Sequence, residues 1–203
     1  MDYINNLSLT GDQKKYLKEL DEKIKSIMPD SLYRHSINTL EYANLIAKRN
    51  LADIDLFSLS IACILHDYGR IFSYEELLKI AKENKLGISD FELSTPPVLH
   101  GFVSDYLVSR DFNIYDSKIL KAIKYHTIGY CNMSLADKIL FIADKIEKGR
   151  SYKGVENLRD LALKNINLCL LEVYKNTIIY IIEDNKLMHP DTAKIWNNIC
   201  GGI

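Results

Sequence analysis

The chain has 203 residues, of which 47% are hydrophobic and 26% are charged, and its formal net charge is −1 at pH 7. This composition is typical of a globular protein and excludes a disordered chain, while the near-neutral charge excludes a broadly basic nucleic-acid-binding protein. Nine glycines and four prolines are few for this length, which favours long helices over a turn-rich β fold.

Helix caps and apolar spacing predict helices along nearly the whole chain. We therefore predict an all-α fold with one domain over residues 1–203, a core at 30–198, and residues 1–29 as an N-terminal helix packed on that core. In the first half of the chain, helices are expected from Thr10 to near Pro29, from Asp30 to Asn50, from Asp53 or Asp55 to Asp67, from Ser73 to Gly87 and from Pro97 through Val108. In the second half, they are expected at 116–126, 134–146, 155–164 and 167–185, and from Pro190. Loops are expected at 88–96, 127–133 and 149–154.

The cysteines and the N-terminus indicate a cellular compartment. Cys63, Cys131, Cys169 and Cys200 form no C-x-x-C pair, which argues against a zinc knuckle or redox motif and fits reduced thiols. The N-terminus lacks the basic start and apolar run of a signal peptide, and the longest aliphatic cluster, 178–182, is too short to span a bilayer. We expect a cytoplasmic protein without a membrane or nucleic-acid partner, and a homodimer stays open.

Histidines, and acids within apolar segments, are the candidate metal-binding side chains. His66-Asp67 ends an apolar helix and Asp144 lies inside another apolar stretch, so both acids are costly to bury unless they are paired or bind metal. With His35, His100 and His126 they form a mixed nitrogen–oxygen set that suits iron, manganese, nickel, cobalt or zinc rather than calcium or magnesium. One such histidine alone is more often a core or cap residue, so the prediction depends on the whole ordered set. Six side chains suffice for two ions if one carboxylate bridges.

The ordered set resembles a known family. The series His35, His66-Asp67 and Asp144 is similar to the HD-domain metal-dependent phosphohydrolases, and with His100 and His126 it is similar to the two-metal members. The surrounding segments resemble the YqeK-type hydrolases, bacterial enzymes that cleave diadenosine tetraphosphate symmetrically. This resemblance covers about residues 30–198 and implies a single HD-domain helical bundle with a buried two-metal site. The similar segments are ILHDYGR at 64–70, VLHG at 98–101, AIKYHTIG at 122–129, MS at 133–134, DKILFIADKIE at 137–147 and RSYKGVENLR at 150–159.

The resemblance also implies a ligand set and a reaction. His35, His66, Asp67 and Asp144 would hold one ion, and His100 and His126 would hold the second, with Asp67 bridging. Iron is the expected metal, with manganese, cobalt, nickel or zinc as alternatives. A bridging hydroxide would attack an inner phosphorus, so that diadenosine tetraphosphate and water give two ADP. The implied activity is that of a symmetrical bis(5'-nucleosyl)-tetraphosphatase, with the choice of adenine or guanine left open.

Basic and polar residues near the ligands are the candidates for substrate contacts. Phosphoryl transfer requires neutralisation of oxygen charge, and Arg70, three residues after Asp67, can grip a phosphate with its guanidinium. We therefore expect catalytic roles for Asp67, Arg70 and Arg150. The predicted substrate-binding residues are Arg70, Thr127, Lys145, Arg150 and Tyr152, although a solvated helix end is an equal alternative for Lys145.

Aromatic and second-sphere candidates lie further along the chain. Tyr152 and Trp196 can stack on adenine, with core packing favoured for Trp196. We expect Asp137 to orient a ligand histidine. His189 is expected at the start of the last helix rather than at a metal.

The chain departs from the family pattern at two places. Arg70 stands where the family usually has lysine, and because arginine keeps its proton we do not expect it to donate one. Residues 146–150 lack the family's proline, which predicts a more mobile loop.

Two alternative functions stay open. Another HD-domain nucleotide phosphohydrolase, either a nucleotidase or a phosphodiesterase, fits the six ligands equally well. A non-catalytic HD-fold sensor fits less well, because none of the six is missing.

Overall fold

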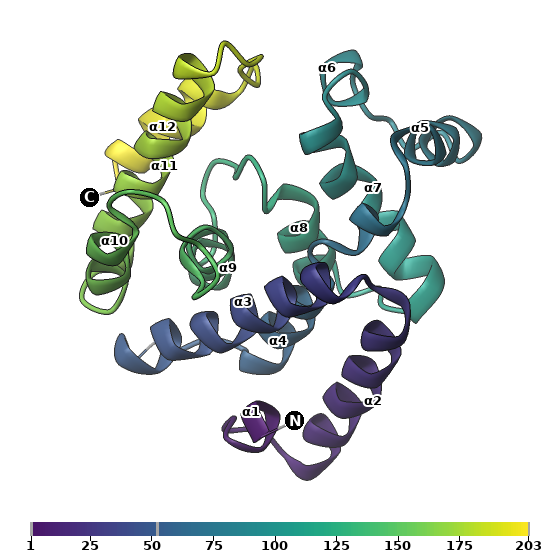
Figure 1. The fold of residues 1–203 in the computed structure, drawn as a ribbon, viewed down its shortest axis with the longest axis vertical. Coiled ribbons are helices and arrows are strands. Elements are labelled where there is room, and N and C mark those ends of the chain that lie inside the picture. Colours follow the sequence, from purple (N-terminus) through teal and green to yellow (C-terminus); the bar gives the residue numbers. More distant parts are fainter. Residues whose placement is uncertain (1, 52, 203) are drawn as a thin grey trace.

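The regular elements of the protein are helices, as the sequence predicts (Figure 1). The computed structural model describes residues 2–51 and 53–202, and no strand occurs in these two ranges. The elements are α1 (Asp2–Asn5), α2 (Gly11–Ile27), α3 (Asp30–Arg49), α4 (Leu56–Leu65), the 3₁₀ helix η1 (Tyr68–Ile71), α5 (Tyr74–Glu83), α6 (Asp90–Leu93), α7 (Pro96–Phe112), α8 (Ser117–Tyr125), α9 (Leu135–Ile146), α10 (Val155–Ala162), α11 (Ile166–Glu183) and α12 (Thr192–Cys200).

Local capping sets where the predicted helices begin. The hydroxyl of Thr10 accepts from the backbone N–H of Gln13, and the Gln13 side chain accepts from the backbone of Thr10 in return. The same reciprocal pair begins α5 at Ser73 and α9 at Ser134. Each cap satisfies backbone donors that the first helical turn leaves unpaired, which is why residues three apart in sequence predict these starts.

Two short α-helices and the 3₁₀ helix η1 lie outside the predicted elements. The expected loop over 88–96 contains α6, so that prediction is wrong at residues 90–93. The carboxylate of Glu92 accepts from the backbone of Ser89 at 3.1 Å and lies 2.9 Å from His189 Nε2, which precedes α12. A cap and a contact between distant segments therefore stabilise a helix too short to show apolar periodicity. The short α1 is the second such element.

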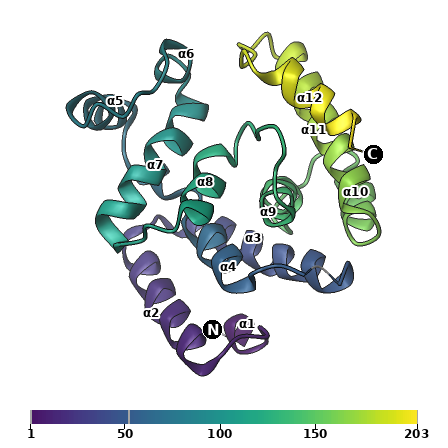
Figure 2. The ribbon, with the colours of Figure 1, turned by 180° about the vertical axis from the view of Figure 1, so that it is seen from behind.

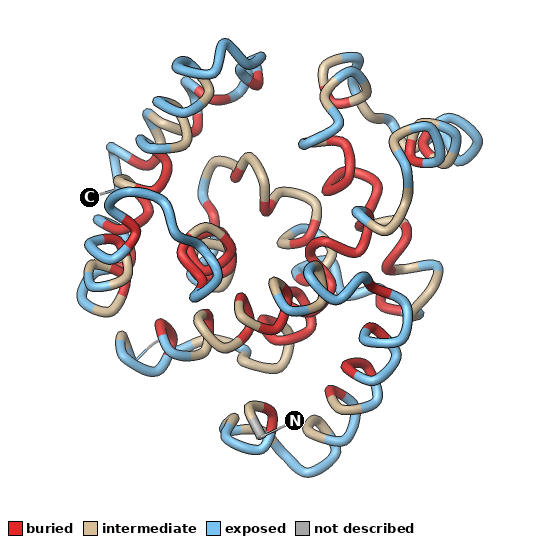
Figure 3. Tube along the Cα trace, in the orientation of Figure 1, coloured by how far each residue is buried: buried red, intermediate tan, exposed pale blue. Residues whose placement is uncertain are grey.

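Helix α9 lies at the centre of the bundle. It contacts α3 and α4 on one side and α10 and α11 on the other, an arrangement that both views show (Figures 1 and 2). Ile139, Leu140, Phe141, Ile142 and Ala143 are all buried there, and the buried segments of the trace gather on α4, α7 and α9 (Figure 3). The packing of these apolar residues also holds the carboxylate of Asp144, on the same helix, inside the protein.

A second group of helices completes the bundle around α4. Helix α8 packs against α4 and α7, and α7 packs against η1, α5 and α6. Helix α2 packs on α3 and α4 and buries Leu17, Leu20 and Ile24. Within the described residues, no helix combines the length and the apolar character needed to cross a bilayer.

Candidate metal centre

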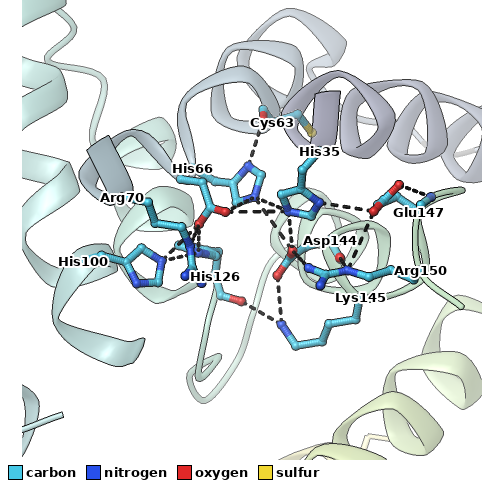
Figure 4. Close-up of polar contacts among 12 residues, drawn as sticks. His35, Cys63, His66, Arg70, His100, His126, Asp144, Lys145, Glu147 and Arg150 are labelled. Atoms are coloured by element: carbon cyan, nitrogen blue, oxygen red, sulfur yellow. Dashed lines mark hydrogen bonds and ion pairs between the residues drawn. The ribbon is translucent and has the colours of Figure 1, made fainter. Parts of the chain in front are cut away.

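The six predicted ligands come from five helices and converge on one place, and Figure 4 labels all of them except Asp67. His35 lies within α3, His100 within α7 and Asp144 within α9. His66 and His126 are the C-terminal cap residues of α4 and α8, and Asp67 follows His66 directly. Their donor atoms form three overlapping groups, each of which could hold a metal ion.

One half of the cluster joins α3, α4 and α9. His35 Nε2 lies 2.9 Å from Asp144 Oδ1 and 3.2 Å from His66 Nε2. Asp67 Oδ2 is 3.7 Å from His35 Nε2 and 3.8 Å from His66 Nε2. Two imidazoles and two carboxylates therefore face one another in this half.

The other half joins the two remaining histidines to the same aspartate. Asp67 Oδ1 lies 3.1 Å from His100 Nε2 and 3.3 Å from His126 Nε2, and those two nitrogens are 3.1 Å apart. The two oxygens of Asp67 thus face different histidine pairs.

Backbone carbonyls fix the orientation of two rings. His66 Nδ1 donates to the carbonyl of Cys63 at 2.8 Å, and His126 Nδ1 donates to the carbonyl of Ile123 at 2.7 Å. A carbonyl can only accept, so in the neutral ring Nδ1 carries the proton and Nε2 presents a lone pair to the centre. Inward lone pairs and carboxylate oxygens form a donor set that fits a divalent cation.

Burial and neighbouring charges hold His66, His100, Asp67 and Asp144 in the protonation states that metal binding requires. It lowers the pKa of His66 to about 3 and that of His100 to about 4, so both rings are neutral at pH 7. Burial acts to raise the pKa of Asp144, but the charge of Lys145 and the hydrogen bond from His35 outweigh it and hold that pKa well below its usual value. The pKa of Asp67 is also well below its usual value, because the surrounding imidazoles outweigh its burial.

Two glycines allow the helices to approach closely enough to form the cluster. A Cβ on Gly101 would lie 2.9 Å from the carbonyl of Lys124, so the glycine lets α7 pack against the end of α8. A Cβ on Gly69 would lie 2.6 Å from the carbonyl of His100 and 2.5 Å from Ser104 Oγ. The absence of these two side chains brings Asp67, His100 and His126 together.

Three cationic side chains lie beside the cluster. Arg70 Nε donates to Asp67 Oδ1 at 2.7 Å, and 45% of the Arg70 side chain is exposed. On the other side, Arg150 Nη2 donates to Asp144 Oδ1 at 3.0 Å and Lys145 Nζ lies 3.2 Å from Asp144 Oδ2. Each cation touches a carboxylate of the cluster, and the two arginines remain half-exposed.

Of the other residues predicted to contact the substrate, two lie beside the metal cluster and one packs in the core. Thr127 follows His126, and its buried hydroxyl has no hydrogen-bond partner among the described residues. Tyr152 is 42% exposed and donates to the carbonyl of Lys145 at 3.0 Å. Trp196 packs against the hydrophobic core from α12, as expected.

Asp137 and His189 have partners outside the metal cluster. The Asp137 carboxylate contacts Ser134 in the α9 cap and the hydroxyl of Tyr130. It touches no ligand histidine, so the prediction for Asp137 is wrong. His189 precedes the last helix, as expected, and pairs with Glu92 away from the cluster.

The residue that contacts a ligand ring is instead Glu147. Its buried Oε1 lies 3.3 Å from His35 Nδ1, and its second oxygen accepts from the backbone of Gly149. Arg159 donates to the carbonyls of Ile146, Glu147 and Arg150 and so holds the same turn. Both residues lie in segments that carry the family resemblance, and that is the only sequence signal for them.

The fold and the cluster define a class of protein. The chain belongs to the HD domain family, whose model matches residues 32–149. The crystal structure of a predicted HD superfamily hydrolase from Clostridium acetobutylicum superposes with a TM-score of 0.84 at 29% identity, over 92% of this chain and 97% of that chain.

Within this class, three curated relatives are named symmetrical bis(5'-nucleosyl)-tetraphosphatase. The chain is 32% identical over 179 residues to the symmetrical bis(5'-nucleosyl)-tetraphosphatase of Bacillus subtilis, covering 88% of this chain and 95% of that protein. It is 33% identical over 176 residues to the protein of the same name from Halalkalibacterium halodurans, covering 87% and 92% respectively. The predicted resemblance to the YqeK-type hydrolases is confirmed, and the chain is a metal-dependent phosphohydrolase of that family.

Proposed function

We propose that this protein is a symmetrical bis(5'-nucleosyl)-tetraphosphatase that hydrolyses diadenosine tetraphosphate to two ADP. The observation that carries this proposal is that the two oxygens of Asp67 face different histidine pairs within one cluster of six ligand side chains. The names of the relatives, which match over most of their length, support the substrate.

The proposed ligands would serve two ions that share Asp67. His35, His66, Asp67 and Asp144 would hold one divalent ion, and His100 and His126 would hold a second together with Asp67. Iron is our first choice, and manganese, cobalt, nickel or zinc suit the same donors. When bound, the ions polarise a phosphate and lower the pKa of a water molecule. Glu147 accepts from His35 Nδ1 and so keeps Nε2 of that ring directed at the cluster.

The cations beside the cluster position the polyphosphate. Arg70 directs a half-exposed guanidinium outward from Asp67, and Arg150 does the same from Asp144. They neutralise phosphate oxygens on either side of the cleaved bond, where negative charge spreads as ADP leaves. Lys145 adds charge beside Asp144, Thr127 donates its unpartnered hydroxyl to a phosphate oxygen, and Tyr152 stacks on a base.

We also propose the domain organisation, the cellular compartment and the ligands of the enzyme. Residues 1–203 form one HD domain, since core residues of α2 and α12 belong to the same hydrophobic cluster as those of α9. The four cysteines are free, which supports a reducing cytoplasm. The substrate is a small nucleotide, a dinucleoside polyphosphate, and the product from diadenosine tetraphosphate is ADP.

Product analysis tests the reaction. Metal-loaded protein is incubated with diadenosine tetraphosphate, and the nucleotides are separated by chromatography. We expect ADP as the sole nucleotide product, because attack at an inner phosphorus divides the chain in the middle. Formation of ATP and AMP, or no turnover beside rapid phosphate release from a nucleoside monophosphate, would contradict the proposal and favour another HD-domain phosphohydrolase.

A further inference from the structure

The turn that follows α9 reaches one half of the metal cluster with two side chains. Glu147 Oε1 lies 3.3 Å from His35 Nδ1. Arg150 donates to the carboxylate and to the backbone carbonyl of Asp144, at 3.0 Å in both cases. Both contacts to the proposed ligands therefore depend on how firmly the backbone of this short segment is held.

The turn has little stiffness of its own. Gly149 lies at its centre, and glycine restricts the backbone less than other residues do. The N–H of Arg150 donates to the carbonyl of Glu147 at 2.9 Å, which closes the turn locally. Lys148 pairs with Glu41 on α3, but 60% of the Lys148 side chain is exposed, and exposed ion pairs stabilise weakly. A stronger restraint has to come from another element.

Arg159 on α10 supplies that restraint. Its Nε donates to the carbonyl of Ile146 at 2.8 Å, and its Nη2 donates to the carbonyls of Glu147 and Arg150 at 2.6 and 2.8 Å. Ile146 is the last residue of α9, where carbonyls lack partners within the helix, so the guanidinium also caps that helix. Because its donors form a rigid planar fork, it fixes the three carbonyls relative to one another.

The guanidinium of Arg159 is itself held in place. Its Nη1 pairs with Glu156 on the same helix, and only 13% of the Arg159 side chain is exposed. On α3, the ring of Tyr42 lies 5.9 Å from the guanidinium carbon. The donors of Arg159 are directed at backbone carbonyls and at Glu156, so it reaches the cluster through the turn.

We propose that Arg159 is a positioning residue, which holds Glu147 against His35 and Arg150 against Asp144 by binding three carbonyls of the turn. It touches neither the proposed ligands nor the substrate. Its effect on turnover rests on the proposed function, whereas its effect on the turn does not. Without the guanidinium the turn relaxes, and both contacts weaken together.

Kinetics with chemical rescue form the first test. We expect Arg159→Ala to lower kcat for diadenosine tetraphosphate roughly 10- to 100-fold, the usual cost of losing a group that orients metal ligands, while KM changes less than about threefold. Methylguanidinium in the buffer should restore part of the rate, because it reproduces the planar donors, whereas methylammonium of equal charge should not. Lys148→Ala is the matched control, since it removes an exposed cation from the same turn and should keep kcat.

A second set of variants tests whether Arg159 acts through the turn. In protein that already carries Glu147→Ala and Arg150→Ala, adding Arg159→Ala should lower kcat by less than about twofold, because effects of residues that act through one another do not add. Arg159→Lys keeps the charge but not the fork and should also lose rate, and it serves if Arg159→Ala fails to fold.

Hydrogen–deuterium exchange measures the turn itself, without substrate. The amides of residues 146–150 should exchange faster in Arg159→Ala than in the wild type or in Lys148→Ala. Unchanged kcat in Arg159→Ala, or a loss of rate with unchanged exchange and no rescue by methylguanidinium, would overturn the inference. Failure of the proposed function is a separate result, because it appears as the absence of ADP from diadenosine tetraphosphate in the wild type.

Discussion

Replacement of Asp67 by alanine is expected to abolish turnover of diadenosine tetraphosphate and to lower the metal content of the purified protein. The carboxylate lies between both histidine pairs, so its loss removes a donor from each half of the cluster. A bound metal contributes several kcal/mol to stabilising transition-state charge, and each 1.4 kcal/mol is a factor of ten. We therefore expect kcat/KM to fall roughly 1,000-fold or more.

Metal analysis and steady-state kinetics check this prediction together. Asp105→Ala is the matched control, because Asp105 is an aspartate on α7 that pairs with Lys124 and touches none of the ligands. The control should retain metal and activity. Full activity in Asp67→Ala, with circular dichroism showing a folded protein in both variants, would contradict the ligand assignment.

Replacement of Arg70 by alanine is expected to slow the reaction strongly while the metal stays bound. Its Nε donates to Asp67, but none of its atoms belongs to the ligand set, and 45% of its side chain is exposed and so accessible to a phosphate. Removing one preorganised donor to developing negative charge costs roughly 100- to 1,000-fold in kcat. The expected result is a loss of this size with unchanged metal content.

The variant Arg70→Lys tests whether the reaction needs only the positive charge of Arg70 or also the planar shape of its guanidinium. Lysine keeps the positive charge but not the planar fork of arginine, so it should recover much of the rate that alanine loses if charge is what the reaction needs. If Arg70→Ala lost metal to the same extent as Asp67→Ala, Arg70 would be acting through Asp67 alone. Unchanged kinetics in Arg70→Ala would exclude it from the reaction.

The sequence predicts helix starts well, because the contacts that set them are local. Ser73 and Ser134 each bond to residues three positions later, so the pattern and the structure contain the same information. Ser89 and Glu92 show this spacing too, and the pattern could have located α6. Four residues are too few for apolar periodicity, however, and the contact with His189 joins residues 97 positions apart in the sequence.

The six ligands could be proposed from their residue types and apolar surroundings, but their assignment to two ions depended on the family pattern. Nothing in the local sequence indicates that His35 and Asp144 meet, since α3 and α9 are brought together by packing of the core. The same limit explains the choice of Asp137 over Glu147. Asp137 had the expected spacing on the helix of Asp144, whereas Glu147 reaches His35 only because the chain turns at the end of α9.

Metal stoichiometry measured alongside turnover tests the central claim most directly. We expect about two divalent transition-metal ions per chain in the active protein, as a dinuclear site requires. A chelator should remove these ions and stop ADP formation from diadenosine tetraphosphate, and adding metal back should restore both. Symmetrical cleavage at the full rate by protein freed of divalent ions would contradict this account.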